Sequence, residues 1–410
     1  MSIVDAAWAY LPGGWKQAVR FHVSGKRIER IETGLSTNTT QLIVPAVHNA
    51  HSHAFQWEMR GHSHSLERGH EDDDFWSWRN AMYALAERMT PARAEEIATE
   101  LYTRMVSVGY GSVGEFHYLH HSLDAADSPL AMAEAHARAA EKAGIRLVLL
   151  PVAYNRGGFG KPAAGAQTRF SFATVEAFLT YVTRMRSALT GATTSVGVGV
   201  HSVRAVPRDW LRPIAEYGRT HDLPIHVHAS EQRGELLQCR AEYGTTPIHL
   251  LAAERFLGPS TTVVHATHLE AGELEALVET ETNICICPTT ERDLGDGLPV
   301  VADMLRAGAH VCVGSDSHSV VDAREEMRLL ELNERMRLER RNVLTDSARG
   351  LLRPGDVVLG YGTAGGARSL GLPDQGLVAG AEWRPLLIGC DDLIPDQASA
   401  ERAFDRWLFC

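Results

Sequence analysis

The residues best suited to chemistry in this sequence are histidines that stand close to one another or to a carboxylate. His51 and His53 are two positions apart, Glu231 lies three positions after His228, and Asp316 follows a run of small and apolar residues. Two histidines at positions i and i+2 of a strand project to the same side, so they can present two imidazole nitrogens to one ion. These spacings predict a hydrolytic metal centre.

The fold must bring these residues together, because 20 histidines in 410 residues produce about one His-x-His pair by chance. Short runs rich in valine, isoleucine and alanine alternate with longer segments of helical period. This alternation is typical of βα units and a parallel sheet. It predicts eight strands, at residues 42–47, 111–116, 145–153, 194–200, 224–227, 261–264, 283–287 and 310–314.

Eight βα units fit an α/β fold of the TIM barrel type. A doubly wound open sheet is the alternative, but residues 49–53 after the first strand contain no glycine-rich phosphate turn. Helix signals lie between the strands: Thr90 and Pro91 open a segment that stops near Gly109, and residues 127–129 open one that stops at Gly144.

The two ends of the chain differ from the middle. Residues 1–41 and 375–410 carry short alternating runs, at 19–23 and 383–388, together with tryptophan and glycine. We expect both ends to form one small β-sandwich domain beside a barrel of residues 42–374.

Polar residues gather after the predicted strands, where the active site of such a barrel lies. A third histidine from the fifth strand and a carboxylate from the eighth would complete a set of three nitrogens and one oxygen with room for water. His228 is the expected ligand from the fifth strand because it is nearer the rim, while His226 is expected to be buried and hydrogen-bonded. The predicted ligands are therefore His51, His53, His228 and Asp316.

Three residues near the predicted metal are expected to act in catalysis. Asp316 is both a ligand and the base for an attacking water, and Glu231 is placed to move a proton to or from the substrate. A helix N-terminal carboxylate is the alternative role for Glu231. His265 is placed to polarise or hydrogen-bond the reacting group, whereas His268 should pack or face solvent.

One metal ion is expected rather than two, because the fourth strand ends at His201 and offers no lysine that could become a carboxylated bridge. Zinc and iron both suit such a site. The six cysteines form neither a CxxC pair nor a dense secreted pattern, so we expect reduced thiols. Core packing is the expected role of Cys285 and Cys287, with metal binding as the alternative.

Charge and composition exclude several other classes of protein. The net charge is −11, and no basic run interleaved with aromatic residues could follow a nucleic acid backbone. No run of 18 apolar residues occurs, and the amino terminus lacks the pattern of a secretory signal. We therefore expect a cytoplasmic protein that binds neither nucleic acid nor membrane.

Longer motifs resemble a known family, the amidohydrolase superfamily, and within its mononuclear deaminase branch the formimidoylglutamate deiminases. The resemblance spans nearly the whole chain. It rests on residues 48–56 (HNAHSHAFQ), 115–121 (EFHYLHH), 226–232 (HVHASEQ), 264–268 (VHATH) and 287–291 (CPTTE). Residues 376–383 and the charged pair Arg292 and Asp293 depart from the family pattern; the first concerns the small domain and the second the rim of the site.

The resemblance implies a zinc-dependent homodimer that hydrolyses N-formimino-L-glutamate to N-formyl-L-glutamate and ammonia in histidine catabolism. Such a dicarboxylate substrate needs cationic donors, ideally guanidinium groups. By similarity to the family's substrate-binding elements, the expected contacts are Gln56, Arg79, Tyr118, His201 and Arg204. A surface ion pair is the alternative role for each arginine.

Two other functions stay open. The substrate could be an aminated heterocycle of the guanine or adenosine type, for which aromatic and amide groups would matter more than Arg79 and Arg204. The chain could also be a metal-binding protein without activity. Residues 62–74, which contain His62, His64 and His70, are expected to be solvated or to form a lid.

Overall fold

The computed structural model describes residues 1–35, 38–62, 64, 75–373, 376–390 and 396–410. Eight parallel strands form the predicted barrel, in the order β5-β6-β7-β11-β12-β13-β14-β15. Ser52 after β5 pairs with Asp316 after β15 in a parallel bridge, which brings the first and last strands side by side. The barrel strands are β5 (Val47–Ser52), β6 (Tyr110–His117), β7 (Arg146–Ala153), β11 (Val198–Ser202), β12 (Ile225–Ala229), β13 (Thr261–His265), β14 (Asn283–Ile286) and β15 (His310–Val313).

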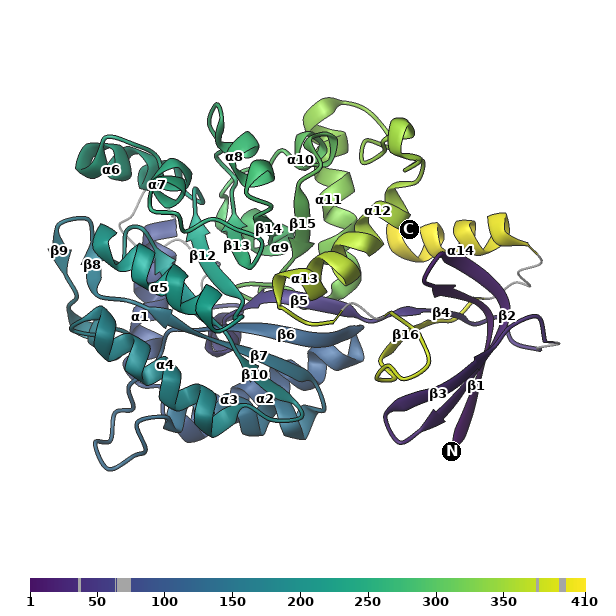
Figure 1. Cartoon of the computed structure of the whole chain (residues 1–410), viewed down its shortest axis with the longest axis horizontal. Helices are drawn as coiled ribbons and strands as arrows, with labels where there is room; N and C mark the ends of the chain where they lie inside the picture. Colours follow the sequence, from purple (N-terminus) through teal and green to yellow (C-terminus); the bar gives the residue numbers. More distant parts are fainter. Residues whose placement is uncertain (36–37, 63, 65–74, 374–375, 391–395) are drawn as a thin grey trace.

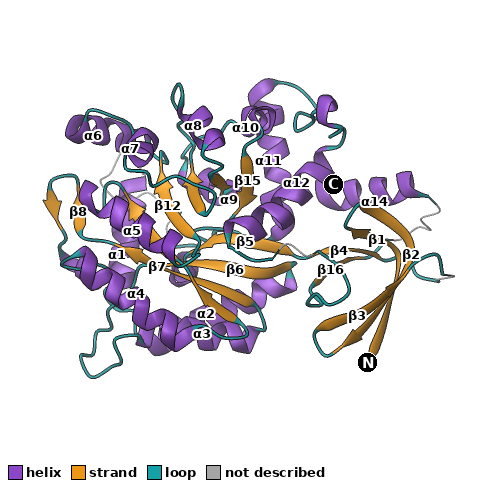
Figure 2. Cartoon of the chain, in the orientation of Figure 1, coloured by secondary structure: helices purple, strands orange, loops and turns teal. Residues whose placement is uncertain are grey.

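Helices connect the strands and surround the barrel (Figure 2). Thr90 caps the second helix through its side chain, and Gly144 ends the third in a left-handed conformation, as the sequence signals predicted. The α-helices up to β15 are α1 (Phe75–Ala86), α2 (Pro91–Ser107), α3 (Ala131–Ala143), α4 (Val175–Leu189), α5 (Arg208–Thr220), α6 (Arg233–Tyr243), α7 (Pro247–Ala253), α8 (Glu273–Glu279), α9 (Pro288–Leu294) and α10 (Val301–Ala307). After β15 follow α11 (Ala323–Leu338), α12 (Pro354–Gly360), α13 (Gly366–Ser369) and α14 (Gln397–Phe409).

Both ends of the chain meet in a small β-domain at one side of the barrel, as predicted (Figure 1). Its described strands form one sheet in the order β16-β4-β1-β2-β3. They are β1 (Ser2–Leu11), β2 (Gly14–Ser24), β3 (Arg27–Glu32), β4 (Leu42–Pro45) and β16 (Pro385–Ile388). The carboxyl-terminal helix α14 packs near this sheet through Phe404, whose ring lies 5.8 Å from that of Trp15. Short pieces β8 (Arg156–Gly158), β9 (Lys161–Pro162) and β10 (Thr194–Val196) complete the strands.

The predicted bounds of the first barrel strand, residues 42–47, are wrong. β4 pairs with β1 and β16 in the small sheet, and the barrel strand β5 begins only at Val47. The apolar run from Leu42 to Val47 is almost wholly buried, so its hydrophobicity gives no boundary. Pro45 lacks a backbone N–H and separates the two strands. As a result His51 lies within the strand and not after it.

A glycine beside His51 lets the barrel close tightly under the site. A Cβ atom on Gly314 would stand 2.7 Å from the His51 Cβ and 3.0 Å from the Cys285 sulfur. Both contacts are too short for carbon, so a larger residue after β15 would displace His51.

In the described part of the chain, no helix is long and apolar enough to cross a membrane.

Candidate active site

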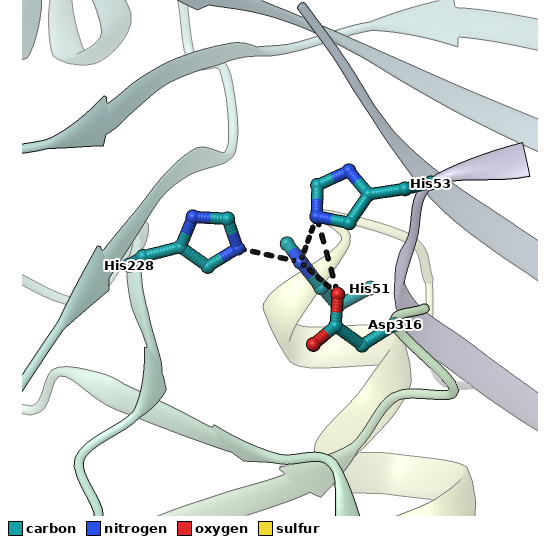
Figure 3. Close-up of side chains that lie close together, drawn as sticks. All are labelled: His51, His53, His228 and Asp316. Carbon is teal, nitrogen blue, oxygen red and sulfur yellow. Dashed lines mark hydrogen bonds and ion pairs between the residues drawn. The ribbon is translucent and has the colours of Figure 1, made fainter. Parts of the chain in front are cut away.

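The four predicted metal ligands converge at the carboxyl ends of three strands (Figure 3). His51 belongs to β5 and His53 follows it, His228 belongs to β12, and Asp316 follows β15. The Nε2 atom of His51 lies 3.1 Å from that of His53 and 2.9 Å from that of His228. Asp316 Oδ1 lies 3.2 Å from His53 Nε2 and 3.5 Å from His51 Nε2. All four side chains are buried.

The outer ring nitrogens determine which tautomer two of these histidines adopt. His53 Nδ1 lies 3.0 Å from the carbonyl oxygen of Phe116, and His228 Nδ1 lies 3.0 Å from that of His201. A carbonyl only accepts, so each Nδ1 must carry the proton. The Nε2 lone pairs of both rings therefore face the centre of the cluster, an arrangement that calls for a cation between them.

The donor set fits a divalent metal ion. One ligand atom from each of the four residues lies within 4.8 Å of the others. A tetrahedral ion about 2.0–2.1 Å from each nitrogen would separate neighbouring nitrogens by roughly 3.3 Å, close to the distances here. Burial lowers the pKa of His51 to about 3, which keeps its ring neutral. Burial alone would raise the pKa of Asp316, but the neighbouring His51 and His53 hold it well below its usual range.

Three carboxylates surround His265 at the end of β13. Its Nδ1 lies 3.3 Å from Glu291 Oε1, and its Nε2 lies 3.5 Å from Asp316 Oδ2 and 3.7 Å from Glu231 Oε1. Burial alone would lower the pKa of His265, but Glu231, Glu291 and Asp316 together raise it to about 10. Burial also raises the pKa of Glu231. A protonated imidazole beside a carboxyl group of raised pKa is suited to proton transfer.

A pocket of about 460 Å³ opens beside this cluster. It contains all five predicted substrate contacts and, in addition, apolar side chains that sequence reasoning did not single out. The lining residues are His53, Gln56, Phe75, Trp78, Arg79, Met82, Tyr83, Tyr118, His201, Arg204, His228, Glu231, His265, Leu294 and Asp316.

Two arginines lie on one side of the pocket. The Cζ of Arg79 is 4.5 Å from the centre of the Trp76 ring, and that of Arg204 is 5.4 Å from it. Arg204 is 8% exposed, and the buried Nε of Arg79 has no hydrogen-bond partner among the described residues. Burial lowers the pKa of Arg79, followed by smaller effects that include the charge of Arg204. Among the residues described, neither guanidinium pairs with a carboxylate, so the surface ion pair expected as their alternative role is not formed there.

The neutral predicted contacts form a polar wall. The Gln56 amide donates to the Tyr118 hydroxyl over 2.8 Å, and the buried Gln56 Oε1 has no partner among described atoms. Burial, together with the charge of Arg204, lowers the pKa of His201 well below its ordinary value, so its ring is neutral. These groups can therefore accept or donate single hydrogen bonds without adding charge.

Several secondary predictions have a clear outcome. His226 is buried and its Nε2 lies 3.0 Å from the carbonyl oxygen of Ser369, which confirms the structural role expected of it. His268 is half-buried and its ring packs against Gly297. A Cβ atom on Gly297 would lie only 3.3 Å from this ring. His64 lies 3.7 Å from Asp293 at the rim. His70 and residues 71–74 lie outside the described part of the chain.

The cysteine predictions are confirmed. Cys239, Cys285, Cys287, Cys312 and Cys410 are free thiols, and the first four are buried. Cys285, Cys287 and Cys312 pack with Ala50 and Val264 inside the barrel. Cys287 lies within ligand distance of His265 and Asp316, but burial raises the pKa of its thiol well above the ordinary value. The contacts of Cys287 inside this apolar cluster support packing as its role.

Sequence reasoning gave no role to Glu291 or Asp296. The Glu291 carboxylate accepts a hydrogen bond from the Cys287 N–H at the start of α9 and also contacts His265. Its Pro-Thr-Thr-Glu context was a usable signal for a helix start with an acidic residue in its first turn. Asp296 follows the left-handed Gly295 after α9, and no motif marks it.

The chain belongs to the amidohydrolase family, whose profile matches residues 42–380. Residues 1–40 match the family described as formimidoylglutamate deiminase HutF, N-terminal domain. The barrel, the small β-domain and the buried histidine and aspartate cluster agree with this membership.

One curated relative is similar over the whole chain. Formimidoylglutamate deiminase of Pseudomonas aeruginosa is 36% identical over 100% of this chain and 91% of its own length. A solved amidohydrolase from Brucella melitensis is 34% identical and superposes with a TM-score of 0.90 over 100% of this chain and 91% of its own. An atrazine chlorohydrolase from Arthrobacter aurescens, solved with zinc, shares the fold at 17% identity and a TM-score of 0.77, covering 99% and 90% of the two chains.

Proposed function

We propose that this protein hydrolyses N-formimino-L-glutamate to N-formyl-L-glutamate and ammonia, a step of histidine catabolism. The relative from Pseudomonas aeruginosa, similar along the full length, supports this activity. The pocket supports it independently, because its lining combines two arginines with carboxylates at the predicted metal site.

The distribution of charge is the observation that carries the proposal. Arg204 is buried and Arg79 is half-buried, and neither has a carboxylate partner among described residues. Both guanidinium groups lie near the Trp76 ring. Glu231 and the predicted metal ligand Asp316 line the same pocket. The substrate has the complementary pattern, with two carboxylates at one end and a basic formimino group at the other. Guanidinium groups bind carboxylates in a bidentate manner, which a neutral heterocycle would not require.

The cofactor is expected to be one zinc ion held by His51, His53, His228 and Asp316, and iron also suits these ligands. The zinc in the chlorohydrolase of the same fold supports this choice. When bound, such an ion activates a water molecule for attack on a carbon–nitrogen centre.

The protein's own residues then move the protons. Asp316 would take the proton of the attacking water. Its Oδ1 contacts His51 and His53, whereas its Oδ2 lies 3.5 Å from His265 Nε2. Glu231, whose pKa is raised by burial, is suited to protonate the formimino nitrogen. His265, kept protonated by its carboxylate neighbours, stabilises negative charge that develops beside it.

The remaining contacts orient the substrate. Arg79 and Arg204 are proposed to bind its two carboxylates, with Gln56, Tyr118 and His201 as neutral hydrogen-bond partners. The resemblance to the deiminases further supports a homodimer, which light scattering of the purified protein would test. It also supports a cytoplasmic location.

The deciding experiment measures ammonia release from N-formimino-L-glutamate by purified protein of known metal content. Guanine and 5-methylthioadenosine serve as competing substrates, because deaminases of such heterocycles share this superfamily. Asp316→Asn is the negative control. Release from the formimino compound alone, lost in Asp316→Asn, supports the proposal. Release only from a heterocycle would refute the substrate assignment and leave a deaminase.

A further inference from the structure

Next to the predicted metal ligands lies a second group of polar atoms that the proposed mechanism uses only in part. One oxygen of Glu231, one ring nitrogen of His265 and one oxygen of Asp296 all lie within 4.8 Å of one another. All three residues are buried. Asp296 is not needed for metal binding or for binding the substrate carboxylates.

The turn after α9 holds Asp296 in this position. Gly295 ends the helix with φ of +68°, and the Asp296 N–H donates to the Glu291 carbonyl over 2.9 Å. The Gln232 side-chain amide donates to Asp296 Oδ1. Asp296 is only 3% exposed, and its Oδ2 has no hydrogen-bond partner among the described residues. A buried carboxyl oxygen without a donor is costly unless a guest supplies one.

The size of the group is compatible with a hydrogen-bonded guest. Three atoms that lie within 4.8 Å of one another surround a point at most about 2.8 Å from each of them, which is within the length of an N–H···O hydrogen bond. The group can therefore make hydrogen bonds to one nitrogen that carries several N–H donors. The number of zinc ions bound per chain distinguishes this guest from a second metal.

Charge points to the same guest. Burial, then the neighbouring charge of Glu231, raises the pKa of Asp296 to about 9. Ammonia can donate a hydrogen bond to each of the two carboxyl groups and accept one from His265.

We propose that Glu231, His265 and Asp296 form the site that receives the departing nitrogen of the substrate as ammonia, with Asp296 as a further catalytic residue. This inference rests on the proposed deiminase activity.

The site would also determine which bond breaks. After water adds to the formimino carbon, that carbon holds one OH, the terminal nitrogen and the nitrogen of glutamate. Glu231 protonates the terminal nitrogen, the C–N electron pair goes to that nitrogen, and the oxygen loses its proton as the carbonyl forms. The products are N-formylglutamate and ammonia. Expulsion of the other nitrogen would give glutamate and formamide, so the three residues favour the terminal nitrogen by binding it.

The test compares wild type with Asp296→Asn, which keeps the shape but loses one acceptor, and with Asp296→Ser as a second variant. Asp303→Asn, a surface aspartate that pairs with Arg306, is the matched control. Zinc content and thermal unfolding establish that each variant is loaded and folded. Products are quantified as ammonia, N-formylglutamate, glutamate and formamide.

We expect kcat to fall about 10- to 100-fold in both Asp296 variants while KM changes less than about threefold, since the lost contact forms as the nitrogen leaves. Inhibition by added ammonium should weaken at least about fivefold, and glutamate with formamide should appear among the products. Unchanged kcat, product ratio and ammonium inhibition in both variants would overturn the proposal. So would a second zinc per chain that is lost with Asp296.

A separate measurement distinguishes failure of this inference from failure of the proposed function. If wild type releases no ammonia from N-formimino-L-glutamate, the substrate assignment fails. The ammonia site is then tested by thermal unfolding of the zinc-loaded protein in ammonium chloride, with tetramethylammonium chloride for comparison. Stabilisation by ammonium alone that disappears in Asp296→Asn supports the site; equal behaviour of both proteins refutes it.

Discussion

Arg204→Met provides the sharpest test of how the pocket selects its substrate. Arg204 lies just after β11, 8% exposed, with its guanidinium over the rings of Phe75 and Trp76. Methionine preserves much of the apolar stem and removes the charge and the five N–H donors. No described carboxylate forms an ion pair with this guanidinium, so its charge is available to a ligand. The substitution also removes the lowering effect of this charge on the pKa values of Glu231 and Glu235.

The magnitude follows from the contact that is lost. A bidentate guanidinium–carboxylate contact comprises two charge-assisted hydrogen bonds, each of about 1.5 kcal/mol or more. Their loss costs about 3 kcal/mol, which corresponds to a fall in kcat/KM of roughly 150-fold. Arg208→Met is the matched control, since Arg208 pairs with Glu254 on the outside of the barrel and should leave turnover unchanged.

The assay uses steady-state ammonia release with three substrates: N-formimino-L-glutamate and two analogues that each lack one carboxylate. The penalty of Arg204→Met should persist with one analogue and nearly vanish with the other, whose missing group is the one that Arg204 binds. A loss below about fivefold with the full substrate would refute the reasoning. So would a penalty that is equal with all three compounds.

Three further predictions concern the metal and the buried carboxylates. His228→Ala should weaken zinc binding at least about 100-fold in a chelator competition, because it removes one of three nitrogen ligands. Glu115 accepts hydrogen bonds from Ser52 Oγ and the Ala54 N–H on either side of His53, so Glu115→Gln should weaken zinc binding about 10- to 100-fold by the same assay. Burial raises the pKa of Glu235 to about 7, above its unfolded value. Ionisation of this carboxyl therefore destabilises the folded protein as the pH rises from about 4.5 to 7. Glu235→Gln should therefore become more stable relative to wild type by up to about 3 kcal/mol between pH 4 and 8, measured by urea unfolding.

Each of these predictions has a result that contradicts it. Wild-type zinc affinity in His228→Ala would place the metal elsewhere. Unchanged affinity in Glu115→Gln would mean that the backbone around His53 holds its position without this carboxylate. A stability difference in Glu235→Gln that does not vary with pH would show that this carboxyl titrates near its ordinary pKa in the folded protein.

The barrel could be predicted from the sequence because its strands are continuous apolar runs separated by helix signals. The boundary at Pro45 could not, since the residues on both sides of it are apolar and buried, one set in the small sheet and the other in the barrel. The helix α14 was not predicted either. Its buried residues Ala400, Phe404 and Leu408 recur every four positions, but the short alternating run at 383–388 led us to expect β-structure for residues 375–410.

Local spacing decided which parts of the site were visible in the sequence. His51 and His53 share one strand, and Glu231 follows His228 closely, so periodicity relates them without knowledge of the fold. Glu291 and Asp296 approach His265 only through the helix and turn after β14. Such contacts depend on tertiary structure, and a single aspartate after a glycine carries no signal of its own.

The backbone at the strand ends supports the view that the site is built for chemistry. Ser230, His265 and Asp316 have φ values of +56°, +74° and +49°, a region that residues with a side chain seldom adopt. Each such residue costs about 1 kcal/mol or more. The three positions follow or end β12, β13 and β15, where the chain must turn sharply to direct His265 and Asp316 toward one centre. His265 and Asp316 both belong to the buried polar clusters at these strand ends. The convergence of polar side chains around the metal ligands therefore explains why this backbone cost is retained at their positions.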